Sequence, residues 1–327
     1  MAARRLITVP AFLLATAVAS AALPALLVAA WLVSWIPACR GAVPTLLFVC
    51  GYLWCETIGI VASFWVWVRH RDHERFMTAN YRLQCWWANA LMVMARKLFR
   101  LRFQIDGRDA LEGPPALLLP RHASIADTVI PMVFYAIPFG VRLRYVLKKE
   151  LLFDPCLDIV GNRLPNYFVD RGGQDSERAR RGVAELVRDL GPDEGALIYP
   201  EGTRSSADKR DALRRRYADV PEMQAQLDRW PMLLPPRLGG TLAMLGANPG
   251  RDLVFCAHAG FEGSSHFGTL WNGAWMHQHV RIRFWRVPFA AVPAGAEARQ
   301  QFLFEQWDRM AREVTALSAP AAQDSVS

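Results

Sequence analysis

The sequence lacks several patterns that mark common enzyme classes. No Gly-x-Ser-x-Gly segment occurs, and Gly263-Ser264-Ser265-His266 resembles a nucleophile loop only superficially, so a serine hydrolase is disfavoured. No Gly-x-x-x-x-Gly-Lys loop and no dinucleotide-binding fingerprint occur either. The usual nucleotide-dependent enzymes are therefore disfavoured as well.

Metal-ligating patterns are also missing. His277-x-His279 is not the i,i+4 pair of a helical zinc site, and no carboxylate triad accompanies it. We therefore expect no bound metal and no cofactor, and we expect His258, His266, His277 and His279 to be core or surface side chains. Six cysteines show neither C-x-x-C pairs nor zinc-finger spacing and are interpreted as reduced packing residues: Cys39, Cys50, Cys55, Cys85, Cys156 and Cys256.

Acidic residues are too few to balance the basic ones. The chain of 327 residues has 38 Lys and Arg against 30 Asp and Glu, a formal net charge of +8. Such an excess is compatible with an anionic membrane surface, a nucleic acid or an anionic substrate. No recognition helix and no aromatic RNA-binding motif is recognisable, so we expect no nucleic-acid partner.

Charge is absent from the N-terminal region between Arg5 and Arg40. The uncharged run 6–36 exceeds the roughly 20 apolar residues that span a bilayer. A second run, 43–68, is interrupted only by Glu56, which is expensive in lipid and is expected to face the other helix. Residues 1–70 are therefore predicted to be a transmembrane hairpin, in a chain with 52% hydrophobic residues and 12 tryptophans.

Basic residues flank the predicted hairpin asymmetrically. Arg4 and Arg5 precede it and three arginines follow residue 68, whereas the connecting loop holds only Arg40. The positive-inside rule then places both ends, and the catalytic domain, on the cytoplasmic face. The alternative is that residues 1–22 form a cleaved signal peptide, although the apolar run exceeds a signal core.

Residues 71–103 are predicted to form a basic, aromatic amphipathic helix. Its apolar face could lie in the headgroup layer or cover the soluble core, because helical periodicity does not distinguish lipid from protein. Residues 104–317 are predicted to be the catalytic domain, and residues 318–327 a disordered tail.

Short apolar runs alternate with amphipathic segments after residue 100, which is typical of an α/β fold. Residues 116–119 and 196–199 are predicted strands, and residues 124–137, 176–190 and 297–317 are predicted helices.

His122 and Asp127 are the candidate catalytic pair. The strand-to-helix loop carries the imidazole, and the carboxylate one turn into the helix can orient it as a general base. The alternative is structural, because Ser124-Ile125-Ala126-Asp127 also fits the S-x-x-D capping box.

Two further segments place charged residues in turns after strands. Tyr199-Pro200-Glu201-Gly202-Thr203-Arg204 follows the strand 196–199. Phe168-Val169-Asp170-Arg171 enters a glycine-rich turn, where Arg171 could bind a phosphate or be solvated.

Four blocks in this order resemble the glycerolipid acyltransferase family, typified by 1-acylglycerol-3-phosphate acyltransferase. They are His122-x4-Asp127, Phe168–Arg171, Tyr199–Arg204 and Pro235-Pro236-Arg237, within residues 115–240. The resemblance implies a mixed-sheet α/β acyltransferase domain and a role in phospholipid biosynthesis. It also implies direct transfer from acyl-CoA or acyl carrier protein to a lysophospholipid hydroxyl, with membrane lipids as partners.

The resemblance also implies the roles of individual residues. His122 deprotonates the acceptor, and Asp127 orients His122. The residues implied to bind substrate are Arg171, Glu201, Gly202, Thr203, Arg204, Pro236 and Arg237.

The chain departs from many relatives at Arg121 and Ala126, and it contains a basic insert, 205–234, that could contact headgroups or CoA phosphates or be a solvated helix. Lys148 and Lys149 are additional candidates for anion binding. The competing function is a non-catalytic membrane protein that binds anionic lipids, with the His–Asp pair serving only as a cap.

Overall fold

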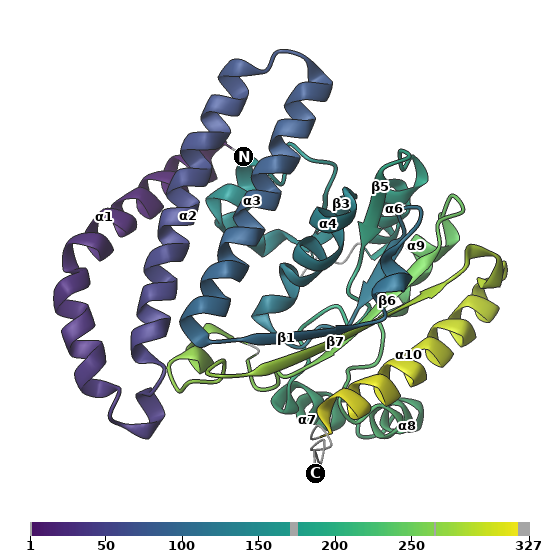
Figure 1. The fold of residues 1–327 in the computed structure, drawn as a ribbon. Coiled ribbons are helices and arrows are strands. Elements are labelled where there is room, and N and C mark those ends of the chain that lie inside the picture. Colours follow the sequence, from purple (N-terminus) through teal and green to yellow (C-terminus); the bar gives the residue numbers. More distant parts are fainter. Residues whose placement is uncertain (1, 171–175, 265, 320–327) are drawn as a thin grey trace, which may run out of the picture.

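The computed structural model describes residues 2–170, 176–264 and 266–319, and within these ranges a seven-stranded sheet forms the centre (Figure 1). Its order is β1-β7-β6-β2-β5-β3-β4, and only β6 and β7 pair antiparallel. The predicted mixed-sheet α/β fold is therefore confirmed. The strands are β1 (Arg102–Asp106), β2 (Leu117–Pro120), β3 (Arg142–Lys148), β4 (Tyr167–Val169), β5 (Glu194–Leu197), β6 (Leu253–Ala259) and β7 (His279–Val287).

Helices cover both faces of the sheet. The α-helices are α1 (Ala2–Val33), α2 (Ala42–Arg69), α3 (His73–Phe99), α4 (Ile137–Phe139), α5 (Pro155–Ile159), α6 (Ser176–Arg188), α7 (Ala207–Arg216), α8 (Pro221–Arg229), α9 (Leu238–Gly246) and α10 (Ala296–Ser318). Shorter turns are η1 (Pro37–Cys39), η2 (Arg108–Leu111), η3 (Ile125–Thr128), η4 (Met132–Ala136), η5 (Lys149–Phe153), η6 (Phe267–Leu270) and η7 (Phe289–Ala291).

Two hydrophobic cores sandwich the sheet. On one face α3 and η4 contribute side chains such as Met92 and Met132, and on the other α6, α9 and α10 contribute side chains such as Val187 and Trp307. Strand β6 supplies both cores because alternate residues point to opposite faces. Val254 and Cys256 face α3, whereas Phe255, Ala257 and Ala259 face α10.

The predicted strands and the helices at 176–190 and 297–317 are found, with ends shifted by one or two residues. The helix predicted over 71–103 ends earlier. Arg100 adopts a left-handed conformation that terminates α3 at Phe99, and Arg102 and Phe103 belong to β1. One face of α3 packs on the sheet core, which agrees with the alternative that this helix covers the soluble core. Trp86 and Val93, on other parts of α3, remain exposed.

The helix predicted over 124–137 is present but irregular. It begins as a 3-10 turn, η3, continues through a π-helical turn, η4, and ends in one turn of α-helix, α4. The β-branched run Thr128-Val129-Ile130 lowers helix propensity, and Pro131 supplies no backbone N–H. Asp127 therefore lies in a tight turn close to His122.

The helices α1 and α2 form a hairpin, as predicted. Thr16 Oγ1 lies 3.0 Å from Thr57 Oγ1, and Trp54 donates to Ser20 Oγ at 3.1 Å. By length and composition, segments 3–33 and 37–69 are apolar enough to cross a membrane. Large apolar side chains on the outer faces, such as Leu6, Trp31 and Trp65, are exposed.

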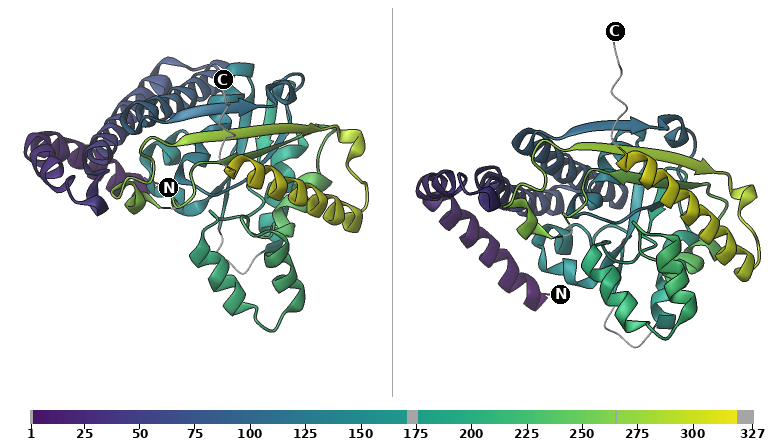
Figure 2. Two further views of the ribbon diagram at one scale, coloured as in Figure 1. Left: turned by 60° about the horizontal axis from the view of Figure 1, so that its bottom comes forward. Right: turned by 90° about the horizontal axis from the view of Figure 1, so that it is seen from below.

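Both ends of this hairpin contact the catalytic domain. Arg4 pairs with Asp158 of α5 at 2.6 Å, and at the opposite tip the Gly41 N–H donates to Trp271 O at 2.9 Å. The hairpin therefore lies along the domain, with α2 beside α3 (Figures 1 and 2). At the same tip Arg40 Nε donates to Asn272 O at 3.1 Å, so the loop between α1 and α2 lies against the rest of the chain.

Glu56 does not face α1, contrary to the prediction. Its carboxylate accepts hydrogen bonds from Trp87 Nε1 of α3 at 2.6 Å and from the Cys156 N–H of α5 at 3.0 Å. Because a buried carboxylate requires donors, these contacts explain why an acidic residue interrupts an apolar helix. Glu56 joins the hairpin to the catalytic domain.

The insert 205–234 folds into α7 and α8, which project away from the hairpin (Figure 2). Arg210 points inward and donates to the carbonyl oxygens of Leu227, Trp230 and Leu233. Arg214 pairs with Asp228 on the surface. Part of the basic charge of the insert thus has a structural role.

Candidate active site

The candidate site lies where β2, β5 and β6 end at the same edge of the sheet. Pro120 is the last residue of β2, and His122 follows two positions later. Tyr199 begins the third sequence block just beyond β5. Because parallel strands present their carboxyl ends at one edge, segments that are far apart in the sequence converge there.

His122 and Asp127 form the expected pair. His122 Nδ1 lies 3.1 Å from Asp127 Oδ2, and the same oxygen accepts the backbone N–H groups of Ala123 at 2.6 Å and Ser124 at 2.7 Å. The capping box is also present, since the Ser124 hydroxyl accepts from the Ala126 N–H. The Asp127 carboxylate therefore both caps the start of η3 and orients the imidazole of His122.

This geometry assigns the imidazole tautomer. An ionised carboxylate only accepts hydrogen bonds, so His122 Nδ1 carries the proton and Nε2 keeps a lone pair. Burial lowers the pKa of His122, as do Arg204 and Lys148, while Asp127 opposes that shift. Burial alone would raise the pKa of Asp127, but His258 and His122 hold it well below its usual range. The pair is thus a neutral imidazole on an ionised carboxylate at neutral pH.

Tyr199 supports the imidazole from the third block. Its ring stacks on His122 with centroids 4.3 Å apart, and its hydroxyl donates to Asp127 O at 2.6 Å. One side chain thereby contacts both members of the pair.

Glu201 joins the loop that carries His122 to the segment that carries Leu234. Its carboxyl oxygens accept the backbone N–H of His122 at 2.7 Å and that of Leu234 at 3.0 Å. Burial raises the pKa of Glu201 to about 8, although these two N–H groups oppose the shift. Glu201 therefore connects the third block to the first block and to Leu234, the residue before the fourth block, and it does not line the cavity.

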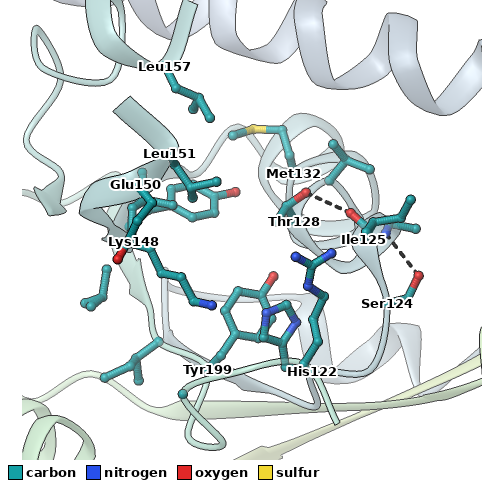
Figure 3. A pocket seen from close by; sticks show the side chains of 18 of the residues that line it. His122, Ser124, Ile125, Thr128, Met132, Lys148, Glu150, Leu151, Leu157 and Tyr199 are labelled. Atoms are coloured by element: carbon teal, nitrogen blue, oxygen red, sulfur yellow. Dashed lines mark hydrogen bonds between the residues drawn. The ribbon is translucent and has the colours of Figure 1, made fainter. Parts of the chain in front are cut away.

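A cavity of about 650 Å³ opens at His122. Its polar end includes Lys148, Arg204 and Arg237, and Figure 3 shows Lys148 extending toward Tyr199 beside His122. Its apolar walls come from α2, α3 and the turn after His122: Phe48, Trp87, Ala88, Leu91, Met92, Ala95, Val129 and Met132. The cavity is thus amphipathic: cationic side chains and a large apolar wall both line it, together with a few other polar groups such as Glu150 and Asp154.

The predicted substrate-binding residues divide into two groups. Gly202, Arg204 and Arg237 line the cavity. Thr203 does not; its hydroxyl accepts from Lys209 Nζ at 2.9 Å. Pro236 also lies outside the lining, and Arg171 falls outside the described residues.

Gly202 is required by geometry. Its φ of +69° is unfavourable for other residues, and an added Cβ would lie 2.6 Å from Arg237 Cδ. The Arg237 N–H donates to Pro200 O at 2.8 Å, so the fourth block is attached to the third.

The two candidate lysines have different environments. Lys148 lines the cavity, whereas Lys149 pairs with Asp170 at 3.0 Å. His258, predicted to be a core or surface histidine, is buried in the core, with Nε2 3.3 Å from Asp127 Oδ1. Its spacing from His122 carries no motif, and only the pairing of β6 with β2 reveals the proximity.

Known proteins resemble this chain in part of its sequence and in its fold. Residues 102–229 match the family model described as Acyltransferase. The 1-acyl-sn-glycerol-3-phosphate acyltransferase of Pseudomonas aeruginosa (strain PAO1) is 26% identical over 137 residues, which are 41% of this chain and 48% of that protein, so the chain spans about half the length of that relative. The structure of the 1-acyl-sn-glycerophosphate (LPA) acyltransferase PlsC from Thermotoga maritima aligns with a TM-score of 0.58 at 13% identity, over 87% of this chain and all of the other, which shows a shared fold.

Proposed function

We propose, from the match of residues 102–229 to the Acyltransferase family model, that this chain transfers a fatty acyl group from a thioester to the free hydroxyl of a lysophospholipid. The observation that carries the proposal is the His122–Asp127 contact at the mouth of an amphipathic cavity. The name of the Pseudomonas relative supports 1-acyl-sn-glycerol-3-phosphate, or a similar lysophospholipid, as the acceptor.

His122 acts as the general base in this proposal. Nε2 removes the proton of the acceptor hydroxyl as its oxygen attacks the thioester carbonyl carbon, and Asp127 stabilises the imidazolium that forms. When the tetrahedral intermediate collapses, the C–S bond breaks and the thiol leaves with the proton from His122. Positioned general-base catalysis of this kind typically contributes about 10²–10⁴ in rate.

The cavity supports this class of substrate. A lysophosphatidate has an anionic phosphate near its free hydroxyl and one long hydrocarbon chain. Lys148, Arg204 and Arg237 would bind the phosphate, since guanidinium groups form paired hydrogen bonds with phosphate oxygens. The apolar walls from α2 and α3 would bind acyl chains. Acyl-CoA and acyl carrier protein both present the required thioester.

The hairpin supports membrane association, and the basic residues that flank it favour the cytoplasmic side. Exposed side chains on α1 and α2, such as Leu14, Trp31 and Trp54, provide an outward apolar face that water solvates poorly and lipid accommodates. We place this face in the bilayer, with the catalytic domain against the membrane surface. Flotation with liposomes tests this: the wild type should float, and a protein that stays in the dense fraction without detergent would contradict it.

The test of the activity is thiol release from a long-chain acyl-CoA by purified protein, with and without lysophosphatidate; acyl carrier protein thioester serves as the second donor. The variants are His122→Ala and Asp127→Asn, and the matched control is His73→Ala, because His73 is exposed at the start of α3. We expect acceptor-dependent release in the wild type and the control, and a loss of about 10²-fold or more in His122→Ala.

Equal release from all of these proteins would instead show that the pair serves only as the capping box. The non-catalytic lipid-binding function would then be the better one, and binding of anionic lipid would be unaffected by His122→Ala.

A further inference from the structure

A second histidine lies beside the pair because of strand register. Strand β6 runs parallel to β2, with Pro120 opposite Cys256. The same offset places His258 opposite His122, just beyond the end of β2. Since Val254 and Cys256 face the core under α3, the alternation along β6 directs His258 to the face that carries Asp127. The two imidazoles therefore approach one carboxylate from neighbouring strand ends.

The two oxygens of Asp127 have different environments. Oδ2 contacts His122 Nδ1 and two backbone N–H groups. Neither Oδ1 nor His258 Nε2 has a hydrogen bond of good geometry among the described residues, and these two atoms lie 3.3 Å apart. Asp127 and His258 are each 1% exposed, so bulk water does not reach this contact. A buried carboxylate oxygen needs a donor, and His258 is in position to supply one.

We propose that His258 is a positioning residue for the acyl transfer: its Nε2–H binds Asp127 Oδ1 and thereby fixes the carboxylate that orients His122. This inference rests on the proposed function. His258 does not line the cavity, so it acts through Asp127 and not on the substrate.

Other charged and titratable groups surround this contact. Arg121 donates to the main-chain oxygen of His258 at 2.5 Å, and the charge of Arg121 is paired with Glu262 at 2.9 Å. The further groups close enough to interact with the charge of Asp127 are His122, Tyr199, Glu201, Arg204 and Cys256. An N–H on His258 Nε2 can donate to Oδ1, while Oδ2 stays in contact with His122 Nδ1.

Two substitutions separate positioning from packing. His258→Gln keeps an N–H donor near the position of Nε2, whereas His258→Leu keeps volume but has no donor. We expect His258→Leu to reduce kcat about tenfold with KM within about twofold, since a hydrogen bond to a charged group is lost. The acid limb of kcat/KM should move to higher pH, because a carboxylate with one donor fewer holds the His122 proton more tightly. His258→Gln should restore both.

Three results would overturn the inference. The first is that His258→Leu has the wild-type kcat and an unmoved acid limb. The second is that His258→Leu and His258→Gln are equally impaired. The third is that kcat falls in His258→Leu while the pH profile of kcat/KM does not change. Thermal unfolding of each variant confirms that it is folded.

A failure of the proposed function is recognised separately, as absence of acceptor-dependent thiol release in the wild type. In that case the contact is still tested by ¹⁵N NMR of histidine-labelled protein, with the His122 signal assigned from His122→Ala. The His122 titration should move upward in His258→Leu and remain in place in His258→Gln. An identical titration in wild type and His258→Leu would refute the inference.

Discussion

The phenol ring of Tyr199 lies almost flat against the imidazole of His122, with an interplanar angle of 29°, and its hydroxyl reaches past the ring to Asp127 O. Stacking limits tilting of the imidazole, and the hydrogen bond fixes the turn that carries the carboxylate. A residue outside the H-x4-D motif therefore controls the geometry of that motif.

Tyr199→Phe is expected to lower kcat about three- to tenfold, because it keeps the stacked ring and removes one hydrogen bond. Tyr199→Leu removes both the stacked ring and the hydrogen bond, and it should lower kcat further. Steady-state thiol release measures the difference, with unfolding midpoints as the folding control. Equal kcat in Tyr199→Leu and wild type would show that the stack has no catalytic role.

The pH dependence follows from the neutral form of His122. Burial lowers its pKa below the ordinary value of 6.5, so the base remains unprotonated down to more acidic pH. The acid limb of kcat/KM should therefore lie below pH 6.5, and rates should fall as pH drops through it. A limb centred above pH 7 in the wild type would contradict the assignment of His122 as a buried base.

Glu201→Gln should damage the site although it is isosteric. The carboxyl group accepts two backbone N–H groups, whereas a carboxamide has one acceptor oxygen and turns an NH₂ toward the second donor. Leaving a buried N–H unpaired costs about 1–3 kcal/mol, and we expect a matching loss of unfolding free energy in urea. Wild-type stability together with wild-type kcat would show that Glu201 does not hold the His122 loop.

Gly41→Ala tests the docking of the hairpin tip. An added Cβ would lie 2.1 Å from Leu270 O and 2.8 Å from the Gly273 backbone nitrogen, so backbone must move to admit it. Gly295→Ala is the matched control, because its nearest neighbour would be 3.9 Å away. We expect a lower unfolding temperature and lower activity in Gly41→Ala only. Identical behaviour of the two variants would mean that the tip is not docked as described.

The features that could be predicted from the sequence are those that depend on residues close together along the chain. Strand β2 and helix α10 follow from hydrophobic periodicity, and the His122–Asp127 pair follows from a spacing that a single turn brings together. The turn at Gly202, which follows β5, could be predicted because its conformation is local. Over 102–229 the predicted family resemblance is confirmed.

Other features depend on tertiary packing and could not be predicted in this way. His258 lies 136 positions after His122 in the sequence, and no spacing rule predicts that they are close. The pairing of β6 with β2 brings them together. Hydropathy identified α1 and α2 as apolar, but it contains no information on what lies beside them, so the contacts of Arg40 and Glu56 with the catalytic domain were missed. The 3-10 and π-helical turns within the helix after His122 were also not predicted, because hydrophobic periodicity does not distinguish them from regular α-helix.

The N-terminal hairpin is more than a tether, because Phe48 and Tyr52 of α2 form part of the cavity wall. A protein shortened to begin at residue 71 would have an open-sided cavity and would lose catalytic capacity together with membrane affinity. Exchange of residues 1–70 between related chains should likewise transfer substrate preference. Solubility engineering in this fold is therefore better directed at the outward-facing side chains of α1 than at removal of the hairpin.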